Sequence, residues 1–280
     1  MQAAAGAFSE SDTATIAALL RRPTPVLAER RMLLAHALGL TAVQVITASE
    51  QQLTPAQVQA VSALYARRES GEPIAYLTGA REFFGLAFEV SPAVLIPRPE
   101  TELLVELAIE RLPRQGSVLD LGTGSGAIAV AIAHTRRDAS VTALDCSDAA
   151  LRIAQRNAAS HAVQIEMLCS DWYGALSGQR FDMIVANPPY IVANDPHLTQ
   201  GDLRFEPVDA LTDHQDGLSA LRKIVLGVTQ HLRPGGWIFM EHGFDQAAAV
   251  RALLSAEPLT EIQSWCDLSG HERVTGARLA

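Results

Sequence analysis

Several classes of protein are excluded by what this 280-residue sequence lacks. Its three cysteines are too few and too scattered for a disulfide scaffold or a four-cysteine zinc site. No apolar run approaches the roughly 18 residues that a membrane-spanning helix needs. The first residues lack the basic start and apolar core of a secretory signal. With a hydrophobic content of 48%, these absences predict a globular protein of the reducing cytoplasm.

Basic charge is also scarce. The chain holds 22 Lys and Arg residues against 31 Asp and Glu residues, a formal net charge of −9. Residues 1–85 carry seven of each sign, so residues 86–280 carry the whole excess, with 24 acidic and 15 basic side chains. A negative field repels phosphates. The charge therefore argues against direct nucleic-acid binding and predicts two regions with different surfaces.

Residues 1–72 are predicted to form a small helical bundle. Thr24-Pro25 and Thr54-Pro55 each place a capping hydroxyl before a proline, which favours a helix start. Helical apolar spacing predicts helices over residues 16–20, 24–39, 41–48 and 54–71. Arginine pairs occur at residues 21–22, 30–31 and 67–68, either on solvated helix faces or facing an acidic partner. No residue here indicates chemistry, which leaves substrate recognition, a lid or a stabilising appendage as alternatives.

Residues 73–99 have the composition of an ordered connector. They mix aromatic and β-branched residues with turn formers, and residues 82–86 and 88–90 are expected to pair as a hairpin. Pro97 and Pro99 are expected to exclude a helix. Thr101 is then expected to cap a helix whose apolar face runs to Ala108.

Residues 100–280 alternate strands with helices. The expected strands cover residues 117–121, 141–145, 163–168, 181–186 and 236–241. The expected helices begin near residues 125 and 149 and cover residues 218–232 and 247–254. This alternation predicts an α/β domain with a parallel sheet and helices on both faces.

A glycine-rich loop follows the first strand of this domain. In the segment D-L-G-T-G-S-G, glycines at alternate positions allow a tight turn and a close approach of a ligand to the backbone. Asp145 ends the next strand, where a carboxylate can accept hydrogen bonds from both hydroxyls of a ribose. The spacing differs from the dinucleotide pattern, and there is no G-x-x-x-x-G-K-[ST] phosphate loop.

This segment resembles the motif of S-adenosylmethionine-dependent methyltransferases, which have a Rossmann-like sheet. The resemblance implies that Asp145 binds the ribose of S-adenosylmethionine. It also implies that the methionine part faces the loop residues Gly122, Thr123, Gly124, Ser125 and Gly126. Trp172 and Asp171 follow the third strand. Trp172 offers an aromatic face for adenine, and Asp171 offers an acceptor for the amine of adenine. An ordinary packing role is the alternative for Trp172.

The fourth strand leads into the turn Asn187-Pro188-Pro189-Tyr190. Adjacent prolines fix the backbone and remove its donors, which leaves the Pro188 carbonyl and the Asn187 side-chain oxygen as acceptors. Two acceptors suit a planar nitrogen with two N–H groups, and Tyr190 is expected to pack against a flat substrate. Asn187, Pro188 and Tyr190 are the catalytic candidates. All four residues of the turn, Pro189 included, are expected to contact the substrate, and Asn187 is also expected to contact the cofactor. A rigid turn is the alternative.

N-P-P-Y resembles the signature of methyltransferases that act on glutamine amides, adenine N6 or cytosine N4. Further motifs narrow the resemblance to the HemK-type (PrmC-like) release factor glutamine methyltransferases. These motifs cover residues 73–79, 82–84, 96–102, 204–207, 216–218, 241–243 and 270–274. The whole resemblance extends from about residue 30 to residue 278.

The resemblance implies methyl transfer from S-adenosylmethionine, giving S-adenosylhomocysteine, to N5 of the glutamine in the Gly-Gly-Gln loop of class 1 peptide chain release factors. A ribosomal-protein glutamine methyltransferase, a DNA or RNA exocyclic-amine methyltransferase and a cofactor-binding module without turnover are the alternatives. Dispersed histidines without an H-x-x-x-H spacing predict no metal site.

Overall fold

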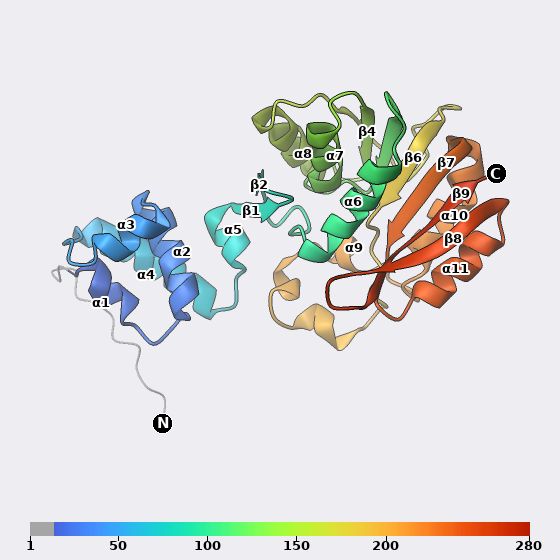
Figure 1. Ribbon diagram of the computed structural model, residues 1–280. Helices are drawn as coiled ribbons and strands as arrows, with labels where there is room; N and C mark the ends of the chain where they lie inside the picture. The colour runs from blue at the N-terminus through green and yellow to red at the C-terminus, as the bar shows by residue number, and fades with distance from the viewer. Residues whose placement is uncertain (1–13) are drawn as a thin grey trace. The chain divides into compact units, whose positions relative to one another are not determined.

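The computed structural model describes residues 14–280, and the chain divides into two compact units, Met1–Gly79 and Ala80–Ala280 (Figure 1). The boundary falls inside the segment 73–99 that the sequence suggested as a connector. Its first part forms helix α5 (Ile74–Thr78), and Leu77 of this helix is buried in the core of the first unit. Its second part forms a hairpin that belongs to the second unit.

The described part of the first unit is helical, as expected. Besides α5 it contains α1 (Ile16–Leu20), α2 (Leu27–Leu38), α3 (Ala42–Thr47) and α4 (Pro55–Glu69). Thr41 and Thr54 form capping boxes at the starts of α3 and α4, each satisfying backbone N–H groups that a helix start leaves free. The inward faces of these helices meet around Leu33, Leu34 and Tyr65, which are at most 1% exposed.

The expected cap at Thr24 is wrong. Helix α2 begins at Leu27 after Val26, and the Thr24 hydroxyl instead donates a hydrogen bond to Glu69 at the end of α4. A Thr-Pro pair favours a helix start only when the hydroxyl is directed at the following N–H groups, and here a carboxylate from a distant helix takes it.

Several of the arginines in the first unit have partners within that unit. Arg67 pairs with Glu72, and Arg68 with Glu29 at 2.8 Å. Arg30 is only 8% exposed. The arginine pairs were expected either to lie on solvated helix faces or to face an acidic partner. Neither expectation describes all three pairs.

The second unit begins with the antiparallel hairpin of β1 (Ala80–Phe83) and β2 (Leu86–Glu89). This confirms the expected hairpin but not its bounds, because Leu86 pairs with Phe83 instead of lying in the same strand. Phe84 and Gly85 at the turn both have positive φ, as a two-residue hairpin turn of type I′ requires. A short 3₁₀ helix, η1 (Pro99–Thr101), then leads into α6 (Glu102–Arg111). The expectation of no helix at Pro99 is wrong because a proline is tolerated in a first turn.

The sheet of this unit has seven strands in the order β5-β4-β3-β6-β7-β9-β8. The five parallel strands are β3 (Ser117–Leu121), β4 (Ser140–Asp145), β5 (Glu166–Cys169), β6 (Phe181–Ala186) and β7 (Leu232–Glu241). The antiparallel edge consists of β8 (Leu259–Cys266) and β9 (Glu272–Leu279), which the sequence reading did not assign. The sheet is therefore mixed rather than wholly parallel.

Helices cover both faces of this sheet (Figure 1). Consecutive residues of β3 show how, because Val118 packs in the cluster with α6 and α7 (Ala127–Thr135), whereas Leu119 packs in the cluster with α10 (Ser219–His231) and α11 (Ala247–Ser255). The remaining helices are α8 (Asp148–Ser160) and α9 (Val208–Leu211), with 3₁₀ turns η2 (Pro196–Thr199) and η3 (Leu203–Phe205). None of the helices in residues 14–280 is long and apolar enough to cross a membrane.

Candidate active site

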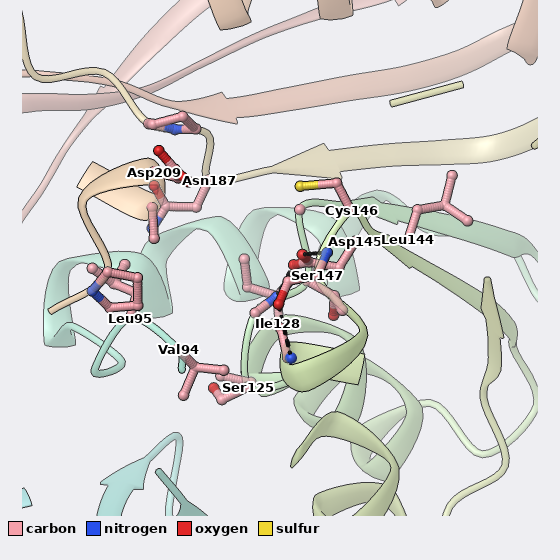
Figure 2. Close-up of a pocket in the computed structure, with 18 of the residues that line it drawn as sticks. Val94, Leu95, Ser125, Ile128, Leu144, Asp145, Cys146, Ser147, Asn187 and Asp209 are labelled. Carbon is pink, nitrogen blue, oxygen red and sulfur yellow. Dashed lines mark hydrogen bonds between the residues drawn. The ribbon is translucent and has the colours of Figure 1, made fainter. Parts of the chain in front are cut away.

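The expected site residues meet at one edge of the sheet. The carboxyl ends of β3, β4, β5 and β6 lie at this edge, and the chain order reverses between β3 and its neighbour β6. Open α/β sheets bind ligands at such a switch point. A pocket of about 410 Å³ lies here, and Figure 2 shows Asn187 and Asp209 on one side of it and Asp145, Cys146 and Ser147 on the other.

The glycine loop forms the wall of the pocket nearest β3. Gly122, Gly124 and Gly126 have φ of +73°, +57° and +81°, which favours glycine at each position. A Cβ on Gly126 would lie 3.0 Å from the Cβ of Ala154, so the loop also packs closely on α8. Gly122, Thr123, Gly124 and Ser125 line the pocket, whereas Gly126 does not.

Asp145 holds this loop as well as lining the pocket. Its carboxylate accepts the N–H of Gly124 at 2.8 Å and that of Ser147 at 2.9 Å. Burial raises the pKa of Asp145, and these backbone hydrogen bonds oppose that effect. The oxygens keep further lone pairs for a ligand in the pocket, because each carboxylate oxygen can accept two hydrogen bonds.

A second carboxylate lies beneath the loop. Asp120 is fully buried and accepts a hydrogen bond from the Thr123 hydroxyl at 2.6 Å. Burial raises its pKa to about 7, although the hydrogen bonds from Thr123 and from the Ala129 backbone act in the opposite direction. Asp120 therefore contributes to the shape of the loop from behind and titrates near neutral pH.

Asn157 ties the loop to the hairpin. Its side-chain Nδ2 donates to the carbonyls of Ser125 at 2.8 Å and Glu89 at 3.0 Å, and its Oδ1 accepts the N–H of Glu89 at 2.7 Å. The side chain is 1% exposed. One buried amide on α8 thus fixes the backbone of two segments that are far apart in the sequence.

The expected adenine residues also line the pocket. Trp172 has a φ of +47°, and its ring lies 3.8 Å from where a Cβ on Gly122 would be. The ring packs partly against the core shared with α10, so it is held from behind. Asp171 beside it is exposed and lines the same pocket.

The N-P-P-Y turn is divided between the pocket and the interior. Asn187 and Pro189 line the pocket, whereas Pro188 and Tyr190 do not. The Asn187 Nδ2 donates a hydrogen bond to the Thr101 hydroxyl at 3.1 Å. The expected helix cap at Thr101 is therefore wrong, because its hydroxyl makes no capping bond and accepts from Asn187 instead. The Tyr190 hydroxyl donates to Glu241 at 3.1 Å, and burial raises its pKa strongly.

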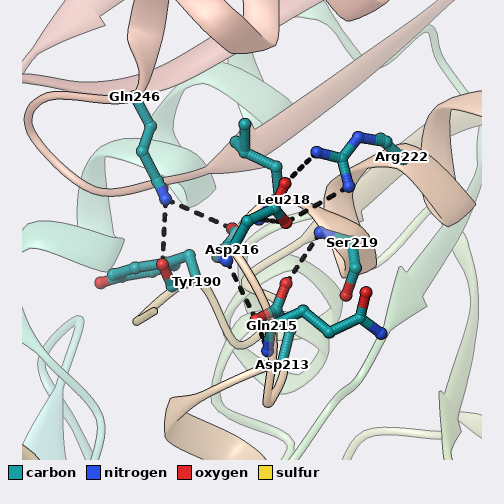
Figure 3. A network of polar contacts seen from close by, with 9 residues as sticks. Tyr190, Asp213, Gln215, Asp216, Leu218, Ser219, Arg222 and Gln246 are labelled. Atoms are coloured by element: carbon teal, nitrogen blue, oxygen red, sulfur yellow. Dashed lines mark hydrogen bonds and ion pairs between the residues drawn. The ribbon is translucent and has the colours of Figure 1, made fainter. Parts of the chain in front are cut away.

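The backbone of Tyr190 is clamped from the other side. Gln246 donates from Nε2 to the carbonyl oxygens of Tyr190 at 3.0 Å and Gly217 at 3.3 Å (Figure 3). A Cβ on Gly217 would lie 2.5 Å from the Tyr190 carbonyl oxygen, so only glycine allows this approach. Asp213 holds the Gly217 turn by accepting backbone N–H groups from Gln215, Gly217 and Ser219.

The segment before η1 and the loop after Tyr190 form the remaining wall. Glu206 is 4% exposed, accepts the N–H of Ile96 at 2.9 Å and pairs with Arg98. Arg98 and Asp209 line the pocket. Among the lining residues that the structure describes, the charged ones are Arg98, Asp145, Asp171 and Asp209.

The sequence reading gave no site role to Thr101, Arg98, Asp209 or Glu241. The resemblance flagged the segments 96–102 and 241–243 without giving their side chains a role. Within residues 14–280, no group of three or more His, Cys, Asp and Glu side chains could hold a metal ion.

Comparisons with known proteins agree with this geometry. Residues 14–79 match a family model described as the PrmC N-terminal domain, and residues 99–201 match the methyltransferase small domain. A solved 16S rRNA N2 methyltransferase from T. thermophilus, in complex with AdoMet and guanosine, is 25% identical with a TM-score of 0.54. That match covers 72% of this chain and 50% of the other.

Relatives over nearly the whole length are more similar. A release factor glutamine methyltransferase from Burkholderia pseudomallei is 54% identical, covering 95% of this chain and 96% of the relative. The protein of that name from Escherichia coli is 46% identical, covering 89% and 91%. With the glycine loop, the N-P-P-Y turn and the helical N-terminal unit all in place, the chain belongs to the release factor glutamine methyltransferase family.

Proposed function

We propose that this chain transfers a methyl group from S-adenosylmethionine to N5 of the glutamine in the Gly-Gly-Gln loop of class 1 release factors. The observation that carries the proposal is the orientation of Asn187. Its amide nitrogen donates to Thr101, which leaves its side-chain oxygen as an acceptor at the end of the glycine-loop pocket. Since release factors act in translation, the reaction belongs to the cytoplasm.

The pocket residues fit this cofactor. A volume of about 410 Å³ is within the range of small-molecule sites, and no side chain projects from the positive-φ positions Gly122 and Gly124. In the proposal, Gly122 to Ser125 hold the methionine part, and Gly126 shapes their loop by packing on α8. Asp145 accepts from the ribose, and Trp172 and Asp171 contact adenine. The bound cofactor supplies an electrophilic methyl group on a sulfonium.

The chain's own residues would activate a poorly nucleophilic amide by positioning it. The amide lone pair is delocalised, so the nitrogen needs orientation and stabilisation of the charge that develops on it. Asn187 Oδ1, which belongs to the pocket lining, would accept one N–H group. The carbonyl of Pro188, a residue that does not itself line the pocket, is proposed to accept the other and so leave the nitrogen facing the methyl group. A neutral amide such as Asn187 is not a base, so the proton that the substrate nitrogen loses on methylation passes to solvent water.

The first unit, including residues 1–72, is proposed to recognise the protein substrate. Val43 and Ile46 on α3 are 68% and 56% exposed, so this unit offers apolar surface as well as its balanced charge. The acidic excess of residues 86–280 supports a protein rather than a nucleic acid as substrate.

Transfer of labelled methyl groups tests the proposal. The whole chain is incubated with labelled S-adenosylmethionine and, separately, a class 1 release factor, the same factor with its Gly-Gly-Gln glutamine replaced by alanine, ribosomal protein, or nucleic acid. Label on the intact release factor alone supports the proposal. Label on ribosomal protein or nucleic acid but not on the release factor contradicts it, and label on none favours a binding module.

The variant Asn187→Ala tests whether the side-chain oxygen of Asn187 acts as the proposed acceptor. We expect this variant to lose transfer while calorimetry still detects cofactor binding, because the substrate amide loses one acceptor. Gln200→Ala, on an exposed position of the following loop, is the matched control and should keep the wild-type rate. A wild-type rate in Asn187→Ala would remove the proposed acceptor role.

A further inference from the structure

The side chain of Gln246 makes three hydrogen bonds to backbone groups outside its own helix. Gln246 is the N-cap residue of α11, yet its side chain makes no cap bond there. Its Oε1 accepts the N–H of Gly243 at 2.8 Å, and its Nε2 donates to the carbonyl oxygens of Tyr190 at 3.0 Å and Gly217 at 3.3 Å (Figure 3). Helices are usually capped by serine, threonine, aspartate or asparagine, so glutamine at this position indicates a role outside α11.

The three partners of this amide lie in three different segments. Tyr190 ends the N-P-P-Y turn after β6, Gly217 lies in the turn before α10, and Gly243 follows β7. The turn at Gly217 is fixed by Asp213, which accepts the Gly217 N–H at 3.0 Å. The carbonyl of Gly243 accepts the backbone N–H of Gln246 at 2.9 Å, so Gln246 is joined to Gly243 twice. The amide therefore ties the Tyr190 carbonyl to two turns that other hydrogen bonds already hold.

The orientation of the Gln246 amide follows from its partners. The N–H of Gly243 needs an acceptor and the two carbonyl oxygens need donors, so Oε1 faces Gly243 and Nε2 faces Tyr190 and Gly217. A glutamate would keep the size of the side chain but would set its carboxylate against two carbonyl oxygens. A methionine would keep the length and make none of these hydrogen bonds. The position therefore requires an amide for a reason that packing alone does not supply.

The turn that Gln246 holds has few restraints of its own. Pro188 and Pro189 lack an N–H, so neither can donate a hydrogen bond to a neighbouring segment. The Asn187 side chain is held separately, through its donation to Thr101 at 3.1 Å. The Pro188 carbonyl is a backbone group, so the path of the backbone alone sets its direction. Because both proline rings fix φ, a shift of the Tyr190 backbone is passed back to Pro188 rather than absorbed between them.

We propose that Gln246 is a positioning residue that directs the Pro188 carbonyl toward the substrate amide by holding the carbonyl of Tyr190. The inference rests on the proposed function, in which Pro188 accepts one N–H group of that amide. The Tyr190 hydroxyl, which donates to Glu241 at 3.1 Å, holds the ring of Tyr190 and leaves the backbone of the turn to Gln246.

Steady-state methyl transfer from S-adenosylmethionine to a class 1 release factor tests this assignment in the whole chain. Gln246→Glu keeps the size of the side chain and removes both donors. We expect kcat to fall by about 10- to 100-fold, because small misplacements of a reacting geometry carry losses of that order. The KM for the release factor, the calorimetric affinity for S-adenosylmethionine and the midpoint of urea unfolding should stay close to wild type. Gln263→Glu, at an exposed position of β8, adds the same charge away from the site and should leave kcat unchanged.

Two further variants separate the missing donors from the added charge. Gln246→Met removes the donors without adding charge, and it should lower kcat to a similar extent. A Cβ at Gly217 would lie 2.5 Å from the Tyr190 carbonyl oxygen, so Gly217→Ala displaces the same carbonyl from another side and should also lower kcat. Gly178→Ala is its control, because Gly178 has a positive φ but nothing within 4 Å of an added Cβ. Combining Gly217→Ala with Gln246→Glu should cost less than the product of the two single losses, because both act on one carbonyl.

The outcomes are distinct. A fall in kcat alone, shared by Gln246→Glu and Gln246→Met, supports the inference. Wild-type kcat in either variant overturns it, and so does a loss of kcat that is matched by equal losses of cofactor affinity or of stability. If neither variant folds, Gly217→Ala decides: a kcat below that of Gly178→Ala supports the inference, and an equal kcat overturns it. Wild-type kcat in Gln246→Glu with lost transfer in Asn187→Ala refutes this inference alone, whereas an unsubstituted chain that leaves the release factor unlabelled refutes the proposed function.

Discussion

Asn157→Ala is predicted to destabilise the second unit and loosen the cofactor pocket together. The substitution removes three hydrogen bonds of a buried side chain, which join α8 to the Ser125 carbonyl and to both backbone groups of Glu89. At a net value of about 1 kcal/mol for each hydrogen bond, the free energy of unfolding should fall by about 3 kcal/mol. The affinity for S-adenosylmethionine should fall too, because Ser125 belongs to the loop that lines the pocket.

Urea unfolding followed by tryptophan fluorescence measures this change in the relevant unit. Trp172, Trp237 and Trp265 supply all the tryptophan signal, and all three belong to the second unit. Gln155→Ala, on an exposed position of the same helix, is the matched control and should change the free energy by less than about 0.5 kcal/mol. A loss below about 1 kcal/mol for Asn157→Ala would show that the three bonds do not hold these segments together.

Three further predictions concern the same loop. Gly126→Ala should lower the free energy of unfolding by about 1–3 kcal/mol through backbone strain. The loss should exceed that of Gly178→Ala, because both glycines have positive φ but only Gly126 also approaches Ala154. Equal losses for the two variants in urea unfolding would show that the contact with Ala154 does not contribute. Asp145→Ala should weaken cofactor binding by about 1–3 kcal/mol, and unchanged affinity by calorimetry would reject the ribose role. Asp120 has a folded-state pKa of about 7, above its ordinary 3.8, so between these values the native state keeps a proton that the unfolded state has lost. The free energy of unfolding of the wild type should therefore fall as the pH rises through this window. Measured relative to Asp120→Asn, which cannot titrate at this position, the fall should be about 4 kcal/mol at most. A difference between the two proteins that is constant from pH 4 to pH 8 would contradict the assignment.

The parts of the fold that local patterns determine were predictable. The capping threonine Thr54, apolar spacing and alternation of strands with helices all act within a few residues, and the bundle and the parallel strands follow from them. The same holds for the glycine loop and the N-P-P-Y turn, since both follow strands whose carboxyl ends meet at one edge of a sheet. The edge strands β8 and β9 were missed because their exposed positions carry mixed polar residues and Gly276 interrupts the alternation.

The support of the site could not be predicted in the same way. Thr101 is 86 residues from Asn187, and Tyr190 is 51 residues from Glu241, so no local period relates them. A threonine before a helix is a good cap on local grounds, yet here its hydroxyl serves a distant amide. Gly217 is similar, because its need for glycine comes from the Tyr190 carbonyl and not from its own turn alone.

The charges around the pocket bear on how the enzyme exchanges spent cofactor for fresh. Three carboxylates in the described lining face the pocket, and the positive charge of Arg98 is balanced by its pairing with Glu206. Loss of the methyl group turns a sulfonium into a neutral thioether, so the product carries one positive charge fewer than the donor. An acidic pocket attracts the charged donor more strongly than the product. With the cofactor bound in this pocket as proposed, the acidic lining therefore favours product release after each transfer.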